Sequence, residues 1–339
     1  MVARILTSVH LTPSILWLRA ILTLAVLALT SCSAPPTAPA PSAKASPSAA
    51  SEPTPALSPE LQPPEAAFAG WIAFVADLGG GYDLYLIDPV TFDLRAFGLV
   101  GLPPGYPAWS PDWAQISFLG PYGDVYLLDV SCLDRGDCRE SLSRYKQDDR
   151  VLFTVSWLPN EEAVIFATDP SQDRQLPQVK ALSLSDGTTS VVLMEGGPNP
   201  RVAPNATSML FDSYIGPDQL MLFDIDTGSI TPLMEKSTRI PNSSSGDWSP
   251  DGTQVAFMTT LGEGMGYGVR YEIVVAQADG TEARIVAEDG LHPDWSPDGS
   301  QIVFEREDGL YVINLATGDE RKITDLPHLH GPPMAAWSP

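Results

Sequence analysis

From residue 68 onward, the chain is a succession of short runs in which hydrophobic and polar positions alternate. Clusters of Gly, Pro, Asp and Ser separate these runs. Alternation with a period of two residues is typical of β-strands that bury one face, and helical spacing of apolar positions is not apparent. The pattern therefore predicts an all-β domain built from many short strands.

The strands belong to a repeat that is marked by a proline and, seven residues later, a phenylalanine. Successive prolines are separated by 42 to 48 residues. The prolines are Pro111, Pro159, Pro204, Pro250, Pro297 and Pro339, and the phenylalanines are Phe118, Phe166, Phe211, Phe257 and Phe304. Four strand-like runs in a repeat of this length are typical of one blade of a β-propeller.

Two copies of the repeat contain WSPDG, at residues 248–252 and 295–299. Ser suits the first position of a type I turn, Pro presets φ at the second, Asp fits the third and Gly the fourth. The turn follows the first strand of the repeat. We expect the Trp before it and the Phe after it to fill the wedge between neighbouring sheets rather than to stack on a ligand.

The final segment, AAWSP at residues 335–339, has no second strand after it. Residues 70–89 read GWIAFVADLGGGYDLYLIDP and supply that continuation, with Phe74 at the position of the repeated phenylalanine. The first blade is therefore expected to take three strands from the start of the domain and one from its end. The sequence predicts a six-bladed β-propeller over residues 68–339, closed by pairing of the C-terminal strand with the N-terminal blade.

The WSPDG turn, followed by a strand ending in Phe and a strand such as DLYLID, resembles the repeat of TolB-type β-propellers. Similar repeats occur in the propellers of prolyl-oligopeptidase-like enzymes. The resemblance is strong at four tryptophans and poorest at Val202, where VAPNA has neither Trp nor Gly. The tryptophans are Trp109, Trp248, Trp295 and Trp337. The resemblance implies a six-bladed toroid, an extracytoplasmic location and a protein partner in the cell envelope, but it does not fix an activity.

Residues 1–31 have the pattern of a lipoprotein signal peptide. Arg4 and Arg19 precede an apolar run of ten residues, which is too short for a mature membrane-spanning helix but suits a signal-peptide core. The following LTSC resembles the bacterial lipobox, which implies cleavage before Cys32 and acylation of its sulfur. An uncleaved anchor helix is the alternative. Both interpretations place the rest of the chain outside the cytoplasm, attached to a membrane.

Residues 32–67 are rich in Pro, Ala and Ser and have almost no bulky apolar side chains. Such a segment cannot bury enough surface to offset the entropy lost on ordering. It is expected to be an extended tether that holds the propeller away from the membrane.

The composition excludes several functions. Asp and Glu number 42 against 19 Lys and Arg, a net charge of −23. This charge repels phosphate backbones, so nucleic-acid binding is not expected, and a solvated acidic surface accounts for the excess. The Gly-rich residues 262–268 lack phosphate-loop spacing. We expect no cofactor and a monomeric protein.

Two of the three cysteines, Cys132 and Cys138, are separated by five residues in a stretch that contains glycine. Outside the cytoplasm two such thiols oxidise to each other, whereas a zinc site would need two further ligands nearby. The sequence therefore predicts a disulfide that closes a loop.

The linkers before the last two inner strands contain His292, His328 and His330, which could meet at one face as part of a metal site. No carboxylate or cysteine stands at metal-like spacing, so histidines exposed on loops are the favoured interpretation. No metal is predicted. A G-x-S-x-G elbow is absent, and NSSSGD at residues 242–247 is expected to be a flexible loop between blades. No catalytic residue is therefore assigned.

Large polar side chains on the loops between blades, and between second and third strands, are the candidates for partner binding. In a propeller these loops gather at one face around the central channel. The candidates are Tyr106, Tyr122, Arg150, Arg201, Tyr214, Arg270, Tyr271, His292 and His328.

The sequence favours a membrane-anchored extracytoplasmic scaffold, without enzymatic activity, whose propeller binds an envelope protein. One alternative is a propeller enzyme or solute-binding protein that acts on a polysaccharide or small metabolite at the channel mouth, optionally with a divalent metal. Another is a structural cell-surface protein without a specific ligand.

Overall fold

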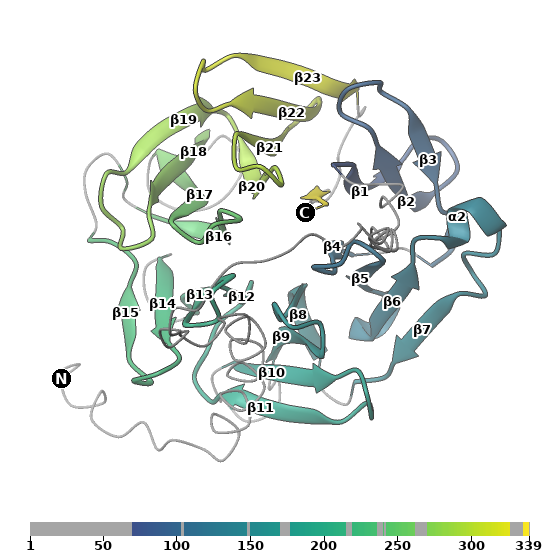
Figure 1. The fold of residues 1–339 in the computed structure, drawn as a ribbon, viewed down its shortest axis with the longest axis horizontal. Helices are drawn as coiled ribbons and strands as arrows, with labels where there is room; N and C mark the ends of the chain where they lie inside the picture. The colour runs from purple at the N-terminus through teal and green to yellow at the C-terminus, as the bar shows by residue number, and fades with distance from the viewer. Residues whose placement is uncertain are drawn as a thin grey trace, which may run out of the picture.

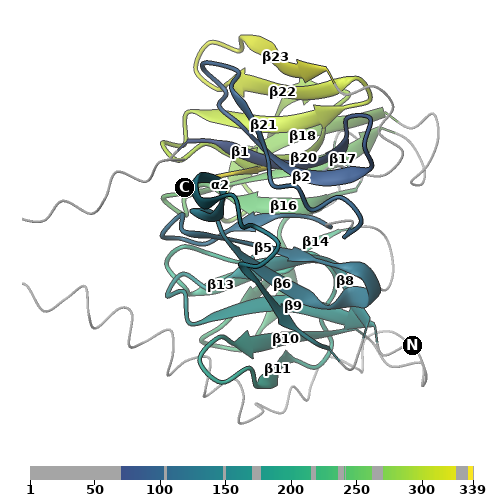
Figure 2. The same cartoon turned by 90° about the vertical axis from the view of Figure 1, so that its right-hand side faces the viewer.

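The computed structural model describes residues 70–102, 105–147, 150–169, 177–214, 219–235, 240, 242–261, 270–325 and 335–338, except the side chains of Tyr122, Phe153 and Leu261. The predicted signal peptide, Cys32 and the tether lie outside the described residues. Within them, the strands form six four-stranded antiparallel sheets around a central axis (Figure 1). Figure 2 shows the same ring from the side. The predicted six-bladed β-propeller is thus confirmed.

Each blade is named here from its innermost strand outward. Blade 1 consists of β24 (Ala336–Trp337), β1 (Ile72–Asp77), β2 (Tyr82–Ile87) and β3 (Leu94–Ala96). Blade 2 consists of β4 (Ala108–Trp109), β5 (Gln115–Leu119), β6 (Val125–Asp129) and β7 (Leu142–Tyr145). Blade 3 consists of β8 (Arg150–Trp157), β9 (Ala163–Asp169), β10 (Gln178–Ser183) and β11 (Thr189–Leu193).

The other three blades follow in chain order. Blade 4 consists of β12 (Arg201–Val202), β13 (Ser208–Asp212), β14 (Leu220–Asp224) and β15 (Ile230–Pro232). Blade 5 consists of β16 (Ser244–Trp248), β17 (Gln254–Leu261), β18 (Arg270–Gln277) and β19 (Arg284–Glu288). Blade 6 consists of β20 (Leu291–Trp295), β21 (Gln301–Arg306), β22 (Gly309–Asn314) and β23 (Glu320–Asp325).

The ring is closed by its two ends, as the sequence predicts. Strand β24 pairs antiparallel with β1, with Ile72 opposite Trp337 and Ala73 opposite Ala336. Beyond the paired residues, the backbone N–H of Ser338 donates to the carbonyl of Trp71 at 2.8 Å. Segments more than 260 residues apart in the chain therefore form one sheet.

The hydrophobic core is divided into six clusters, and each cluster joins residues of two neighbouring blades. The repeated phenylalanine lies in the wedge between its own blade and the preceding one, and is at most 3% exposed. These residues are Phe74, Phe118, Phe166, Phe211, Phe257 and Phe304. Burial of each ring contributes about 1.5–3 kcal/mol. The predicted packing role of these rings is confirmed.

The turn after the first strand has the predicted hydrogen bonds. In blade 5 the carbonyl of Ser249 accepts from the N–H of Gly252 at 2.8 Å, and its Oγ donates to Asp251 Oδ1 at 2.6 Å. Gly252 has φ +68°, in the left-handed region that favours glycine. Glu161 and Ala206 occupy the same turn position in blades 3 and 4, with φ of 62° and 59°.

Antiparallel order gives the disc two different faces. The loops that enter the innermost strands and the loops between second and third strands lie at one end of the blades, which we name the loop face. The tight turns between first and second strands and between third and fourth strands lie at the other end, which we name the turn face.

The connection between β6 and β7 contains the helix α2 (Cys132–Arg135), while the 3₁₀ turn η1 (Pro121–Gly123) lies between β5 and β6. Cys132 and Cys138 are joined by a disulfide, with Cα atoms 4.7 Å apart. No helix of the described residues is long and apolar enough to cross a membrane.

The prediction of a flexible loop at residues 242–247 was wrong for most of that stretch. Ser244–Trp248 forms the innermost strand of blade 5. Its pairing with β17 shifts between Ser244 and Asp247, and Ser245 has φ 51°. A β-bulge of this kind lets a polar, glycine-containing stretch remain in the sheet while one residue stays unpaired.

Candidate functional site

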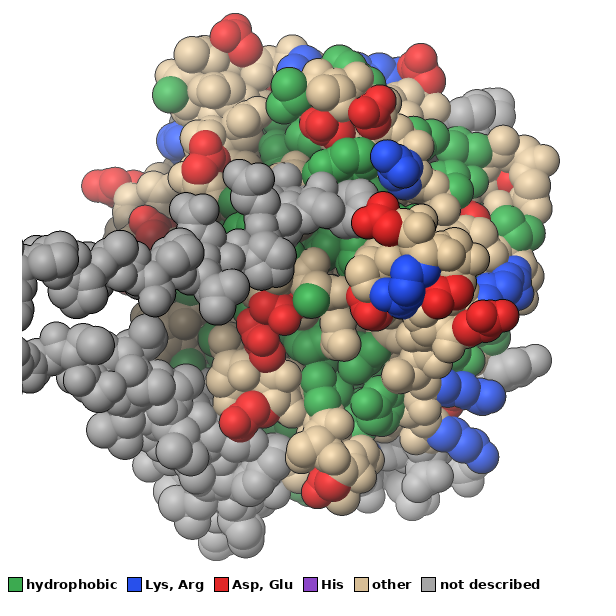
Figure 3. Space-filling view, turned by 45° about the vertical axis from the view of Figure 1, so that its right-hand side comes forward, with side chains coloured by type: hydrophobic (Ala, Val, Ile, Leu, Met, Phe, Trp, Pro, Cys, Tyr) green, Lys and Arg blue, Asp and Glu red, His purple; other side chains and the backbone are tan. Residues whose placement is uncertain are grey.

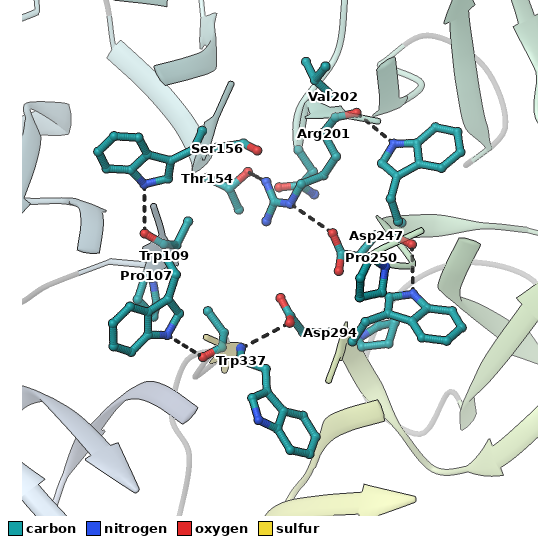
Figure 4. A pocket seen from close by; sticks show the side chains of 18 of the residues that line it. Pro107, Trp109, Thr154, Ser156, Arg201, Val202, Asp247, Pro250, Asp294 and Trp337 are labelled. Atoms are coloured by element: carbon teal, nitrogen blue, oxygen red, sulfur yellow. Dashed lines mark hydrogen bonds and ion pairs between the residues drawn. The ribbon is translucent and has the colours of Figure 1, made fainter. Parts of the chain in front are cut away.

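A cavity of about 450 Å³ lies on the axis of the propeller. Its wall is formed by the six innermost strands, and it extends from the residues that enter these strands to the prolines that follow them (Figure 4). A volume of this size is in the range of small-molecule binding sites. Because all six blades contribute to its wall, the cavity depends on the complete ring.

Indole groups connect the innermost strands of successive blades. Trp Nε1 donates to a backbone carbonyl of the preceding blade in four cases. These pairs are Trp109 to Ala336 (3.0 Å), Trp157 to Ala108 (3.1 Å), Trp248 to Arg201 (3.1 Å) and Trp295 to Asp247 (3.3 Å). Trp337 donates within blade 1, to the carbonyl of Gly70 at 2.7 Å.

Blade 4 has Val202 in place of tryptophan, so no indole crosses the seam between blades 3 and 4. The side chain of Arg201 crosses it instead: its Nη1 donates to Thr154 Oγ1 of blade 3 at 3.1 Å. The weakest copy of the sequence repeat is therefore the one that places the Arg201 side chain in the cavity (Figure 4).

The residue before the tryptophan position faces the cavity in every blade, because alternate side chains of a strand point in opposite directions. We name these six residues the inner ring. In blade order they are Ala336, Ala108, Ser156, Arg201, Asp247 and Asp294. Blades 1 to 3 thus contribute small side chains, and blades 4 to 6 contribute all three charges (Figure 4).

The charges of the inner ring are not balanced. Arg201 Nε lies 3.8 Å from Asp247 Oδ1, and Asp294 Oδ1 accepts only the backbone N–H of Trp337, at 3.1 Å, among the hydrogen bonds that the structure records for it. Burial raises the pKa of Asp247 above its usual value, and Arg201 opposes the effect. Burial and the neighbouring Asp247 carboxylate raise the pKa of Asp294 well above its usual value. Two carboxylates therefore compete for one guanidinium group.

Three residues on the loop-face side of the inner ring have backbones in the left-handed region. Asn199, Ser245 and His292 have φ of 56°, 51° and 47°, and each stands two residues before a charged member of the inner ring. All three line the cavity. Non-glycine residues in this region carry backbone strain, which persists where the surrounding structure holds it. The same three blades therefore contain both the charges and the strained positions.

Two buried carboxylates hold these strained positions. Asp212 of β13 accepts from Asn199 Nδ2 at 2.7 Å and from the backbone N–H of Ser245 at 2.9 Å. Glu305 of β21 lies 3.4 Å from His292 Nδ1. Asp212 and Glu305 are 8% and 1% exposed. Both lie directly behind the wall of the cavity.

Burial dominates the protonation of both carboxylates. It raises the pKa of Asp212 to about 6, against hydrogen bonds from Asn199 and Ser245 that lower it. It raises the pKa of Glu305 to about 7, against the contact with His292. Tyr106, whose ring centroid is 6.5 Å from that of His292, has its pKa raised to about 12 by burial and by the charge of Glu305.

The residues that the sequence singled out for partner binding fall into three groups. Arg201, His292 and the largely buried Tyr106 lie at or beside the cavity. Arg150, Tyr214 and Arg270 are exposed at the loop face, whereas Tyr271 is partly buried against the core. The side chain of Tyr122 and all of His328 and His330 lie outside the described residues.

The candidate histidine cluster cannot be assembled from the part of the chain that the structure describes, since only His292 of the three belongs to it. Within that part, no group of three or more His, Cys, Asp or Glu side chains is placed to hold a metal ion. His292 instead contacts Glu305.

Sequence reasoning missed Asn199, Asp212, Asp247, Asp294 and Glu305. A signal for Asp247 and Asp294 was present, because both precede the tryptophan of DWSP and must face away from the wedge that the indole fills. Asp212 and Glu305 both follow the repeated phenylalanine directly, where the other blades have apolar residues. No local signal distinguishes them from carboxylates at a strand end.

Comparison with solved structures shows which fold this is. TolB from Acinetobacter baumannii superposes with a TM-score of 0.65 at 20% identity, over 80% of this chain and 67% of that one. A putative TolB from Agrobacterium tumefaciens gives 0.59 at 16% identity, over 80% and 99%. An oligogalacturonate lyase in complex with manganese gives 0.50 at 16% identity, over 75% and 73%.

The fold is that of a TolB-like β-propeller. No protein-family model matches the sequence, and no curated protein matches it. At these identities the similarity concerns the fold alone. The charged half of the cavity in this TolB-like propeller is therefore described from its own residues.

Proposed function

We propose that this protein is an extracytoplasmic lipoprotein of the cell envelope whose propeller binds a protein partner on its loop face. Cys32 would carry the lipid, and residues 32–67 would hold the propeller away from the membrane. The TolB-like fold supports this proposal, because it provides a rigid disc with two chemically different faces. The protein is proposed to act as a monomeric scaffold, without a cofactor.

The observation that carries the proposal is the distribution of exposed hydrophobic side chains. Eight large ones are exposed among the described residues. Five of them, Leu78, Tyr82, Val100, Met194 and Tyr214, lie at the loop face. The other three, Val90, Phe92 and Leu94, lie close together in the sequence at the turn face. The larger share of the exposed apolar groups is thus at the loop face, and such groups are typical of interaction surfaces.

Blade 1 contributes three of these residues, Leu78, Tyr82 and Val100. A Cβ atom added to Gly81 would lie 3.2 Å from Val100 Cγ1, so the loop after β1 and the segment after β3 are neighbours. Figure 3 shows the edge of blades 1 and 2 and the turn face beside it, where hydrophobic surface is interspersed with charged side chains. The loop face is turned away in that view, so Leu78, Tyr82 and Val100 are placed from their positions next to the ends of β1, β2 and β3.

A matched pair of variants tests the binding face. Val100→Ser with Tyr82→Ser changes the loop face, and Val90→Ser with Phe92→Ser removes two apolar side chains from the turn face. Tagged full-length protein is cross-linked in its host before solubilisation, and captured proteins are quantified by mass spectrometry. We expect the loop-face variant to lose its partner at least tenfold and the turn-face variant to keep it. Equal capture by both variants, or none above an untagged control, contradicts the proposal.

The lipid anchor is tested separately. Metabolic labelling with an alkyne-bearing fatty acid is expected to label the wild-type protein and the Cys132→Ser variant, but not Cys32→Ser. Mass spectrometry of the mature protein is expected to find an acylated N-terminal Cys32. An unlabelled protein that retains residues 1–31 would favour the uncleaved anchor helix instead.

A further inference from the structure

The charged half of the cavity offers many hydrogen-bond acceptors and few free donors. Its acceptors include the carboxylates of Asp247 and Asp294, which both line the cavity. Among the described residues that line it, Arg201 is the only Lys or Arg. Two carboxylates facing one guanidinium group leave an uncompensated negative charge in a partly buried place, which is costly unless Asp294 takes up a proton or a cation joins the pair.

Part of the donor capacity of Arg201 is engaged. Its Nη1 donates to Thr154 Oγ1 at 3.1 Å and to the carbonyl of Pro200 at 3.2 Å, while Nε faces Asp247. Of its five N–H donors, this leaves the two of Nη2 for a ligand. Asp294, in contrast, keeps acceptor capacity, because an ionised carboxylate has about four acceptor positions and the structure records one hydrogen bond to it, from Trp337.

A second and independent observation comes from Asn199. Its side chain is nine-tenths buried and lines the same cavity. Its Nδ2 donates to Asp212, which fixes Oδ1 as the remaining atom, and Oδ1 has no hydrogen-bond partner in the described residues. A buried carbonyl oxygen without a donor costs free energy, so a donor is expected beside this atom of the cavity wall.

The other half of the cavity wall is lined by small apolar side chains, which leave space for a ligand. The inner ring has Ala336 and Ala108 in blades 1 and 2, and Pro107, Pro111 and Ala335 lie beside them. Such a surface suits a methylene chain rather than a second polar group. The cavity thus presents acceptors on one side and aliphatic contact on the other.

We propose that the cavity binds a primary ammonium group on an aliphatic stem, with Asp294, Asp247 and Asn199 Oδ1 as its acceptors. The three N–H bonds of an ammonium match three acceptors, and its charge matches the uncompensated carboxylate. The same chemistry occurs in the lysine side chain of a peptide and in a free alkylamine. The inference goes beyond the proposed scaffold function, because it holds with or without a docked protein.

The test is calorimetric titration of the purified full-length protein. The charged probes are n-butylammonium and Nα-acetyl-lysine amide, and the uncharged equivalents are n-butanol and Nα-acetyl-norleucine amide. We expect at least one charged probe to bind and its uncharged equivalent to bind at least tenfold more weakly. Asp294→Asn is expected to weaken binding at least tenfold. Asp319→Asn, which removes the same charge from an exposed turn, is expected to leave it unchanged.

Each possible result of the titration either supports the proposal or overturns it. Binding of n-butylammonium alone identifies a free amine as the ligand class, whereas binding of the lysine derivative identifies a side chain. If neither charged probe binds, if the uncharged probes bind equally well, or if Asp294→Asn binds as the wild type does, the proposal is overturned. Should Asp294→Asn not fold, Asp247→Asn and the comparison of probes on the wild type decide in its place. Failure of this test leaves the cross-linking result untouched, so the two proposals can fail separately.

Discussion

Asp212 in blade 4 and Glu305 in blade 6 occupy the same position of the repeat, directly after the buried phenylalanine of the second strand. Each contacts the strained, cavity-lining residue of its own blade, Asn199 or His292. A carboxylate at this position therefore acts as a support for the wall of the cavity, and it appears twice in one ring. Two predictions concern this pair.

The first prediction is that the stability of the protein falls as the pH rises from about 4.5 to about 7. Burial raises the pKa of Glu305 from 4.5 to about 7 in the folded state. Between these values the folded protein holds a proton that the unfolded chain has lost, so the free energy of unfolding decreases with rising pH. For Glu305 alone the loss is about 3 kcal/mol.

Urea unfolding of the wild type and of Glu305→Gln at pH 5 and pH 8 measures this effect. The glutamine cannot ionise, so the variant is expected to lose less stability between the two pH values than the wild type does. Asp212, whose pKa is raised to about 6, keeps part of the pH dependence in the variant. An identical loss in both proteins would show that Glu305 does not titrate in this range.

The second prediction concerns Asp212→Ala. The change leaves Asn199 Nδ2 and the backbone N–H of Ser245 without their acceptor, and both groups are at least partly buried. Each unsatisfied group costs about 1–3 kcal/mol, so a loss of about 2–6 kcal/mol is expected in urea unfolding. The measurement is made at pH 5, below the raised pKa of Asp212, because at higher pH the removal of a buried anion would offset part of the loss. Asp93→Ala, at an exposed position, is the control and is expected to change stability by less than about 0.5 kcal/mol.

A third prediction tests the turn geometry. Gly252 has φ +68° and open space around an added Cβ, with the nearest atom at 3.5 Å, so Gly252→Ala introduces backbone strain without a clash. A loss of about 1 kcal/mol is expected. The reverse change, Glu161→Gly at φ 62°, is expected to stabilise by a similar amount.

The control for this pair is Gly80→Ala. Gly80 has no positive φ and nothing within 4 Å of an added Cβ, so alanine is expected to be neutral or slightly stabilising. Melting temperatures of the four proteins give the comparison. A destabilising Glu161→Gly would mean that the glutamate side chain contributes more than its backbone strain costs.

The architecture could be predicted from the sequence because each blade repeats the same local chemistry. In each copy of the repeat, the proline turn and the phenylalanine seven residues later mark one wedge of the core. The AAWSP segment, which no second strand follows in the sequence, marks the closing strand. The support of the cavity could not be predicted. Asp212 of blade 4 contacts Ser245 of blade 5, which is 33 residues away in the chain. That contact requires a bulge in β16, and the polar residues of this strand do not predict a bulge.

Part of the cavity wall could be predicted from the sequence. Alternation along DWSP places Asp247 and Asp294 on the side opposite the indole, but it does not say that three charges fall in consecutive blades. Two of the charges come from regular copies of the repeat, and the third, Arg201, comes from the copy that has Val202 in place of tryptophan and contacts Thr154 of the preceding blade.

The last prediction concerns closure of the ring. Trp337 is 7% exposed, packs between blades 6 and 1, and donates its indole N–H to the carbonyl of Gly70. Trp337→Ala removes this packing and hydrogen bond from a strand of two residues, and is expected to cost about 3–5 kcal/mol. The measurement is urea unfolding, with Met194→Ala, at a half-exposed position on another blade, as the control. A cost below about 1 kcal/mol would mean that the ring does not depend on its closing strand for stability, because the wedge between blades 6 and 1 would then be filled without the indole.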